Sequence, residues 1–326
     1  MASQLTARNI YEQQAHNKRS TWLVMFGFVL FLGFLGFGFD YYYLGLFEDG
    51  FYFPIGTIIA VIFGSGMAVS SYINGAKSVL TATGAVPADP SNPADRTLIN
   101  VVEEMTIASG LPKPQVYIVT DEDPNAFATG RDPAHSYIVV TQGLLDTLNR
   151  EELQAVIAHE MSHIRNFDIR LMTVVAAFVG SILLLSDGAR RSVRFGVGTG
   201  RRGRSKGGIL IIVWLIAIVL APLVTQMMAM LVSRKREYLA DASSAELTRN
   251  PLGLASALRK LESASSPTAS IKRGAAHLCI VDPLGRNINS REGFAAELFG
   301  THPPIEKRVL ALHAMAYQYK SDATSA

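Results

Sequence analysis

The sequence contains little cysteine and little charge. A single cysteine, Cys279, among 326 residues excludes an internal disulfide and any cysteine cluster for a metal ion. Such a lone cysteine is typical of a small buried apolar residue. Charged residues make up 17% of the chain against a hydrophobic fraction of 49%, a low charge content for a soluble protein. We therefore expect membrane segments together with one modest soluble domain.

Three further absences narrow the class of protein. The net charge of +3 is too small, and too concentrated in one stretch, to indicate a nucleic-acid partner. The long apolar segments contain no ionisable residue that could line the pathway of a channel or transporter. No small-residue cleavage site follows the first apolar segment, so we expect no removable signal peptide.

Two apolar segments lie near the start of the chain. Residues 21–39 and 51–71 are uncharged, and both are long enough to cross a hydrocarbon core of about 30 Å. Basic residues precede the first segment, at Arg8, Lys18 and Arg19, and acidic residues follow it. This asymmetry places the N-terminus in the cytoplasm, to which two crossings return the chain.

Two later apolar segments form a second pair. Residues 171–186 are uncharged but short, whereas residues 209–232 are long enough to cross a membrane. The loop 187–208 between them carries seven basic residues, which argues against placing it outside the cell. If both segments cross, or if neither does, the flanking chain lies on one side of the membrane. The sequence leaves these two alternatives open.

The soluble part combines helices with a few strands. Residues 84–93 are Pro-rich and are interpreted as a linker. Residues 95–109 have the pattern of an amphipathic helix. Residues 116–120 and 136–141 are rich in strand-forming residues, and the stretch 121–135 between them is rich in turn residues. We therefore expect a small sheet in an otherwise helical domain.

The strongest motif is His159-Glu160-Met161-Ser162-His163. Asn149 and Glu152 form a capping-box-like start for its helix, which we expect to continue into the third apolar segment. Positions four apart share one face of a helix, so His159 and His163 can hold the same metal ion. Glu160 lies beside them, where a carboxylate can take a proton from water at the metal.

A candidate third ligand follows the fourth apolar segment. Glu237 supplies a carboxylate, and Asp241 lies one turn later, where it could hydrogen-bond a ligand imidazole and fix its orientation. Two histidines, one glutamate and an open position describe a catalytic zinc site rather than a closed structural one. His163 lies eight residues before the third apolar segment, and Glu237 lies five residues after the fourth. Continuous helices would therefore place both ligands at nearly equal depth, close beneath the bilayer.

The order of these motifs resembles the HtpX-type membrane zinc metalloproteases, in the peptidase family that also contains the CAAX prenyl proteases. The resemblance covers most of the chain. Besides the two ligand motifs, it includes Asn125-Ala126-Phe127-Ala128-Thr129-Gly130, Thr141-Gln142-Gly143-Leu144-Leu145 and Thr301-His302-Pro303-Pro304-Ile305-Glu306-Lys307-Arg308.

The resemblance implies the fold and the roles of these residues. It implies a mainly α membrane protein with four apolar helices and a cytosolic zincin-like (gluzincin) α+β metalloprotease domain with a small sheet. One zinc ion per chain would be held by His159, His163 and Glu237, with Glu160 as the catalytic carboxylate. His302 and Arg308 would stabilise the oxyanion. The stretch Asn125, Ala126 and Phe127 would lie near an edge strand that pairs with an extended substrate.

Ordinary interpretations compete at several of these positions. Asp241 could be a solvated helix charge, and His302 could belong to a cap and turn that opens a helix. Asn166 and Asp168 lie beside the histidine motif and are interpreted as structural. The basic loop 187–208 could be a solvated segment or could bind anionic lipid headgroups.

The combined prediction is a multi-pass zinc endopeptidase of a bacterial inner membrane, with its active site facing the cytoplasm. Its implied role is to cleave misfolded or damaged membrane proteins in a stress response. The implied partners are these substrates, the lipid bilayer and other membrane quality-control proteases. The alternatives are a prenyl-protein processing protease and a catalytically silent zinc-binding scaffold. The predicted parts are a cytosolic segment 1–20, a membrane hairpin 21–72, a first protease part 73–170, a second membrane hairpin 171–232 and a second protease part 233–326.

Overall fold

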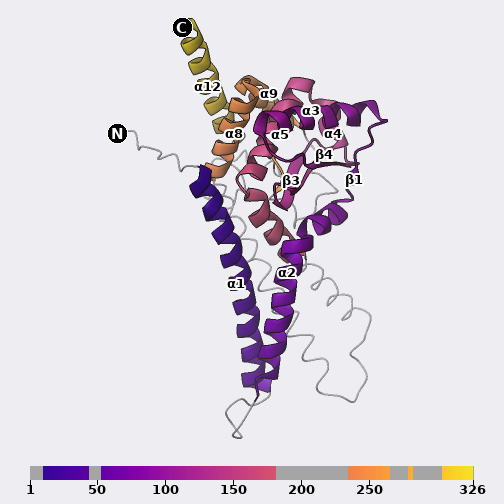
Figure 1. Cartoon of the computed structure of the whole chain (residues 1–326), viewed down its shortest axis with the longest axis vertical. Helices are drawn as coiled ribbons and strands as arrows, with labels where there is room; N and C mark the ends of the chain where they lie inside the picture. Colours follow the sequence, from indigo (N-terminus) through magenta and orange to yellow (C-terminus); the bar gives the residue numbers. More distant parts are fainter. Residues whose placement is uncertain (1–9, 44–52, 181–233, 265–277, 282–302, 326) are drawn as a thin grey trace.

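A long two-helix stalk carries a compact group of helices and a small sheet (Figure 1). The structure is a computed structural model, and it describes residues 10–43, 53–180, 234–264, 278–281 and 303–325. The stalk consists of α1 (Ile10–Tyr43) and α2 (Ile55–Thr83), which lie side by side along their length. The sheet and the remaining helices gather at the end of the stalk where α1 begins and α2 ends.

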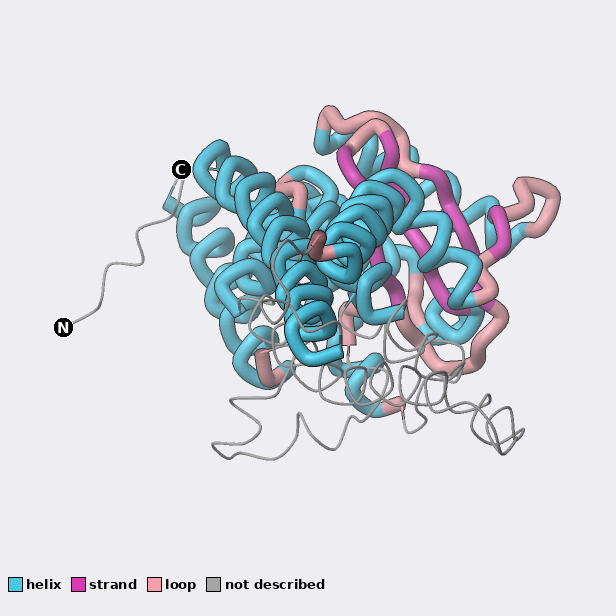
Figure 2. The backbone as a smooth tube through the Cα atoms, turned by 90° about the horizontal axis from the view of Figure 1, so that it is seen from below, coloured by secondary structure: helices cyan, strands magenta, loops and turns pink. Residues whose placement is uncertain are grey.

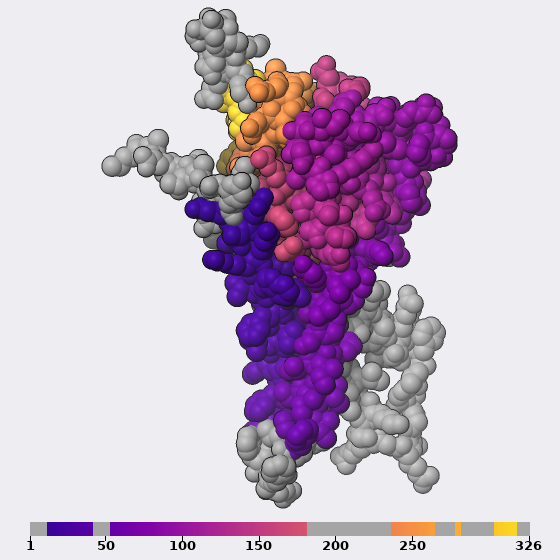
Figure 3. Space-filling model, viewed as in Figure 1, coloured from indigo at the N-terminus to yellow at the C-terminus, as the bar shows by residue number. Residues whose placement is uncertain are grey.

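The stalk helices form the narrow part of the molecule (Figure 3) and expose large apolar side chains. Both helices are long and apolar enough to cross a membrane: an 18-residue stretch within residues 12–41 has a mean hydropathy of 2.2, and one within residues 55–83 has a mean hydropathy of 1.6. Trp22, Phe34 and Ile62 are each more than half exposed. Exposing so large an apolar surface to water is unfavourable, whereas the lipid of a bilayer would cover it. The first apolar segment is therefore confirmed as a helix, and the second is helical from Ile55 on. Each helix also continues past the end of its apolar run.

Asp40 of α1 joins the two stalk helices at the end of the stalk away from the sheet. The first helical residue of α2 follows Pro54, which has no side chain to cap the helix. Asp40 accepts hydrogen bonds from the backbone N–H groups of Gly56 at 2.8 Å and Thr57 at 2.7 Å. A carboxylate in this place satisfies amides that the first turn of a helix leaves free. One helix of the stalk thus caps the other.

The sheet has four strands in the order β1-β2-β4-β3. The strands are β1 (Val86–Pro87), β2 (Gln115–Val119), β3 (Ala126–Asp132) and β4 (His135–Thr141). The β2–β4 pair is parallel, and the other two pairs are antiparallel.

Strand β3 corrects the sequence analysis, which treated residues 121–135 as turns. Pro124, Gly130 and Pro133 gave this stretch its turn-like composition. Gly130 lies at a register shift with φ of 151°, a conformation that favours glycine. The strand forms because its side chains pack against both neighbouring layers, and that packing outweighs local propensity. The Pro-rich stretch 84–93 likewise holds β1 as well as a turn.

The alternation of side chains along β3 and β4 builds two apolar layers. Ala126, Ala128, Ile138 and Val140 belong to the larger core, which includes the helix that bears the histidine motif. Phe127 and Val139 face the opposite way and pack with the end of α2 and with the helical residues 168–180. The sheet therefore connects the metal-site helix on one face to the stalk on the other.

Helices beside the sheet complete the described domain (Figure 2). Besides the helical residues 168–180, they are α3 (Pro93–Ser109), α4 (Gln142–Thr147), α5 (Arg150–Arg165), α8 (Arg234–Thr248), α9 (Pro251–Ser263) and α12 (Ile305–Ser325). Helix α5 lies at the centre, and its middle residues are buried on every side. The capping box of Asn149 and Glu152 is confirmed, since each side chain bonds the other's backbone N–H.

Helix α5 does not continue into the third apolar segment, so the prediction of a continuous helix is wrong. It ends at Arg165, and Phe167 takes a left-handed backbone conformation with φ of 59°. Helical structure resumes at residue 168 and is described to residue 180. A bulky residue rarely adopts this conformation, because its Cβ crowds the backbone. The rest of residues 171–186, all of 209–232 and the basic loop lie outside the described residues, as does most of the predicted second hairpin.

Candidate metal centre

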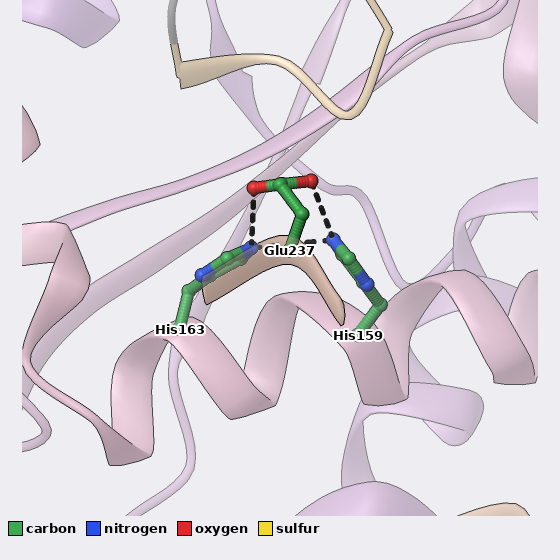
Figure 4. Close-up of side chains that lie close together, drawn as sticks. All are labelled: His159, His163 and Glu237. Carbon is green, nitrogen blue, oxygen red and sulfur yellow. Dashed lines mark hydrogen bonds and ion pairs between the residues drawn. The ribbon is translucent and has the colours of Figure 1, made fainter. Parts of the chain in front are cut away.

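Two helices bring three metal-binding side chains together (Figure 4). His159 and His163 project from the same face of α5, and Glu237 projects from the first turn of α8. The two histidine Nε2 atoms are 3.2 Å apart. The Glu237 carboxylate oxygens lie 3.8 Å from His159 Nε2 and 3.6 Å from His163 Nε2. The predicted ligand set is therefore assembled in space.

The geometry of this cluster fits a zinc ion. Ligand atoms that bind zinc tetrahedrally are about 3.4 Å from one another, since each lies about 2.0–2.2 Å from the metal. The distances between the three side chains lie close to that value, and the possible ligand atoms all lie within 4.8 Å of one another. His159 is fully buried, and Glu237 is 2% exposed. Two imidazoles and a carboxylate buried together form a donor set that suits zinc.

Asp241 orients His159. Its Oδ1 atom lies 3.1 Å from His159 Nδ1, so the ring turns its Nε2 atom toward the other ligands. Arg308 binds both oxygens of Asp241, at 2.8 Å through Nε and 2.6 Å through Nη2. The Arg308 guanidinium and Asp241 are both buried. Asp241 therefore occupies the orienting position that the sequence predicts.

Asp168 orients His163 in the same way, a contact that the sequence analysis did not predict. Its Oδ2 atom lies 3.0 Å from His163 Nδ1. Asp168 can reach the ring only because α5 ends at Arg165 and the chain turns back at Phe167. The polar Asn166 after the last helical residue was the one signal of this turn in the sequence, since asparagine is common where helices end.

The charges around the cluster shift the pKa values of its members. Burial lowers the pKa of His159, and the hydrogen bond to Asp241 opposes that shift. Burial also disfavours charged His163, but its hydrogen bond to Asp168 and the negative charge of Glu237 outweigh burial and raise its pKa to about 9. A metal ion must therefore displace a proton from His163 when it binds.

Glu160 has the pKa of a general base. Burial raises its pKa to about 7, with His163 opposing the shift and the negative charge of Glu237 adding to it. The backbone N–H of Ala128 donates a hydrogen bond to the Glu160 carboxylate. A carboxylate with a pKa near the working pH can both accept and return a proton. Glu160 lines the same small cavity as His159, His163 and Glu237.

The outer edge of β3 lies against this cavity and is paired with another part of the chain. Ile280 donates its backbone N–H to the Ala126 carbonyl at 2.9 Å, and Phe127 forms an antiparallel bridge with Cys279. The Asn125 side chain donates to the Val281 carbonyl at 3.1 Å. Cys279 is fully buried, as the sequence predicts. The predicted substrate strand is thus an edge strand whose first residues are occupied by residues 278–281.

Of the two residues predicted to stabilise the oxyanion, the structure describes Arg308 but not His302. His302 lies outside the described residues, so its role stays a prediction. Arg308 lies at the centre, with Nη1 3.4 Å from a Glu237 oxygen. It is fully buried, and its other donors serve Asp241 and the Ile280 carbonyl. These contacts hold Glu237 and Asp241 in place.

Comparisons with known proteins identify the family. The family model described as peptidase family M48 matches residues 93–316. A protein described as a protease HtpX homolog, from Caldanaerobacter subterraneus, is 45% identical over 95% of this chain and 99% of its own length. A second, from Thermoanaerobacter pseudethanolicus, is 44% identical over 95% of this chain and 99% of its own length.

Among solved structures, the crystal structure of S. mikatae Ste24p matches 93% of this chain and 66% of its own chain. Its sequence is 18% identical, and the TM-score is 0.48.

The assembled ligands, the buried glutamate and the two long apolar helices together define a zinc metalloprotease with membrane helices. The chain belongs to peptidase family M48, in which it is a homologue of the HtpX proteases.

Proposed function

We propose that this metalloprotease is an endopeptidase of a bacterial inner membrane that cleaves misfolded or damaged membrane proteins on the cytoplasmic side. The contact between the start of α1 and the segment that follows His163 carries this proposal. Gln14 and Asn17 of α1 donate hydrogen bonds to the carbonyls of Arg165 and Asn166 at 2.8 Å. The apolar run of α1 begins only a turn later. This contact supports a metal centre that lies close to the membrane surface, within reach of membrane-protein segments.

The residues of the cluster have separate roles in amide hydrolysis. His159, His163 and Glu237 would hold the zinc ion, which when bound polarises the scissile carbonyl and lowers the pKa of a water molecule. Glu160 accepts a proton as the water oxygen bonds to the carbonyl carbon. Glu160 then passes that proton to the nitrogen as the C–N bond breaks, which releases an amine and a carboxylic acid.

Replacing Glu160 with glutamine tests this mechanism. Glu160→Gln retains the three ligand side chains but cannot accept the proton, so we expect unchanged zinc content and loss of cleavage. The measurement pairs metal analysis of the purified protein with cleavage of an unfolded membrane protein. Full proteolysis by the variant would exclude Glu160 as the base. Stoichiometric zinc with no cleavage by the wild type would instead favour a silent zinc-binding scaffold.

We further propose that the substrate pairs with β3 at Ala126 and Phe127. Ala128 of β3 and residues 278–280 beside it both line the cavity at the ligands. An extended peptide at this edge would gain main-chain hydrogen bonds and lie across the ligands. Since Ile280 already bonds Ala126, the peptide must displace the segment 278–281.

The thiol of Cys279 offers a test of that displacement, because it is the chain's one cysteine and is fully buried. In the Glu160→Gln protein, we expect a maleimide to modify Cys279 several-fold faster when an unfolded protein that the wild type cleaves is added. The Cys279→Ser variant provides the blank for the reaction. An unchanged rate at saturating substrate would show that the segment stays on β3 and that substrate binds elsewhere.

A further inference from the structure

The start of α1 lies against the turn that ends the metal-site helix. Asn17 is fully buried, although it precedes the apolar run of a helix that is mostly exposed. Its side-chain nitrogen donates to Asp168 Oδ1 at 2.6 Å and to the Asn166 carbonyl at 2.8 Å. The other oxygen of Asp168 bonds His163. Asn17, Asp168 and His163 therefore form a continuous chain of contacts from the stalk to a zinc ligand.

Further contacts of α1 hold the same turn. Gln14 donates to the Arg165 carbonyl, which the end of α5 leaves without a helical partner. The Lys18 ammonium lies 4.1 Å from the centre of the Phe167 ring. Phe167 is the residue with the left-handed backbone. Such a conformation persists only where its surroundings fix it, and α1 supplies several of the contacts that do so.

The two histidine ligands are thus oriented by matching arrangements. Arg308 holds Asp241 against His159, and both of these supporting residues lie in the part of the chain after α5. Asn17 holds Asp168 against His163, with Arg236 contributing a longer contact of 3.5 Å to the same oxygen. The shortest contact to Asp168 Oδ1 therefore comes from the stalk helix.

We propose that Asn17 is a positioning residue of the zinc site, which acts by fixing the Asp168 carboxylate that orients His163. This inference rests on His163 as a zinc ligand. Removing an orienting partner of a ligand typically weakens metal binding about 10–100-fold. Asn17 acts one contact further from the metal, so its loss should have an effect near the lower end of that range.

Zinc affinity of the full-length protein in detergent tests the proposal without any measurement of activity. All variants carry Glu160→Gln to prevent self-cleavage. Affinity is measured by competition with a chelator, and the absorption spectrum of the cobalt-substituted protein reports the ligand geometry. We expect Asn17→Ala to weaken zinc binding about tenfold and to alter the cobalt spectrum. Gln14→Ala is the matched control, because it removes a contact to the same turn without touching Asp168.

A double-mutant cycle separates positioning from a general loss of structure. If Asn17 acts through Asp168, Asn17→Ala should cause little further loss of zinc affinity in an Asp168→Ala protein. Equal losses in the presence and absence of Asp168, or equal zinc affinities and spectra for Asn17→Ala and Gln14→Ala, would overturn the proposal. Failure of the Glu160→Gln parent itself to bind zinc would instead overturn the metal site.

Discussion

At the scale of single residues, the buried Arg308 links two carboxylates of the metal centre. It binds Asp241 through two nitrogens and lies beside Glu237. The two carboxylates outweigh the cost of burial and hold its pKa above the usual range. Arg308 therefore stays charged and neutralises part of the negative charge that the cluster gathers.

Removal of Arg308 should destabilise the fold. Arg308→Ala leaves two buried carboxylates without their cation, so we expect the free energy of unfolding to fall by about 3–5 kcal/mol. Denaturant unfolding of the protein in detergent measures this loss. Adding Asp241→Ala should cost less than the two single changes predict, because both act on one ion pair. A variant that unfolds like the wild type but has a much lower kcat would favour the predicted oxyanion role.

The sequence predicted those pairs of the metal centre whose members lie one helical turn apart in the chain. The spacing of His159 and His163 places them on one face of any helix, and Asp241 follows Glu237 by one turn for the same reason. Asp168 was not predicted as an orienting residue, since its contact with His163 requires a backbone conformation that helical periodicity does not predict. The role of Asn17 could not be predicted from the sequence, because Asn17 and its partner Asp168 are 151 positions apart in the chain.

At the scale of elements, Glu152 fastens α5 to α9 as well as capping α5. Its carboxylate accepts hydrogen bonds from the Asn149 backbone at 2.9 Å, from Ser256 at 2.6 Å and from Lys260 at 2.7 Å. Burial opposes the charged form, but the bonds from Lys260, Ser256 and the Asn149 backbone outweigh it and lower the pKa of Glu152.

The lowered pKa of Glu152 predicts a loss of stability in acid. The folded protein holds the charged carboxylate more strongly than the unfolded chain, where the pKa is about 4.5. Its contribution is therefore present above pH 4.5 and is lost as the pH falls through the lower folded value. Glu152→Gln should lower the unfolding free energy at pH 7 by about 1 kcal/mol and flatten its acid dependence. Glu151→Gln is the control, since Glu151 is exposed. Equal pH profiles for the two variants would contradict this account.

The cap that Asp40 provides to α2 predicts a second effect at this scale. Asp40→Ala removes the acceptor for two amides in the first turn, so stability should fall by about 1–2 kcal/mol. Asp40→Asn keeps one oxygen and should cost less. The thermal midpoint of the protein in detergent measures both variants. Identical midpoints for wild type and Asp40→Ala would show that the ends of the hairpin need no cap.

At the scale of the whole molecule, the sequence predicted the classes of element better than their connections. The apolar runs predicted the two stalk helices, because lipid-facing residues must be apolar along their full length. The sheet was predicted from β2 and β4, whereas only the family resemblance implied a strand near Asn125. The residue pattern missed β3 because four of its seven residues are alanine, threonine or glycine and its flanks are rich in turn residues. The break after α5 was missed as well, since Asn166 was its one local signal and no glycine or proline interrupts the chain before residue 171.

The contact of Asn17 with Asp168 limits how this protease can be truncated to a soluble fragment. The predicted soluble parts, 73–170 and 233–326, contain all three ligand side chains and the catalytic glutamate. A fragment cut free of the first stalk helix would still lack the amide that bonds Asp168 and the side chain that bonds the end of α5. The region that serves as a membrane anchor is therefore also part of the enzyme, and a truncation designed for solubility would remove a support of its metal site.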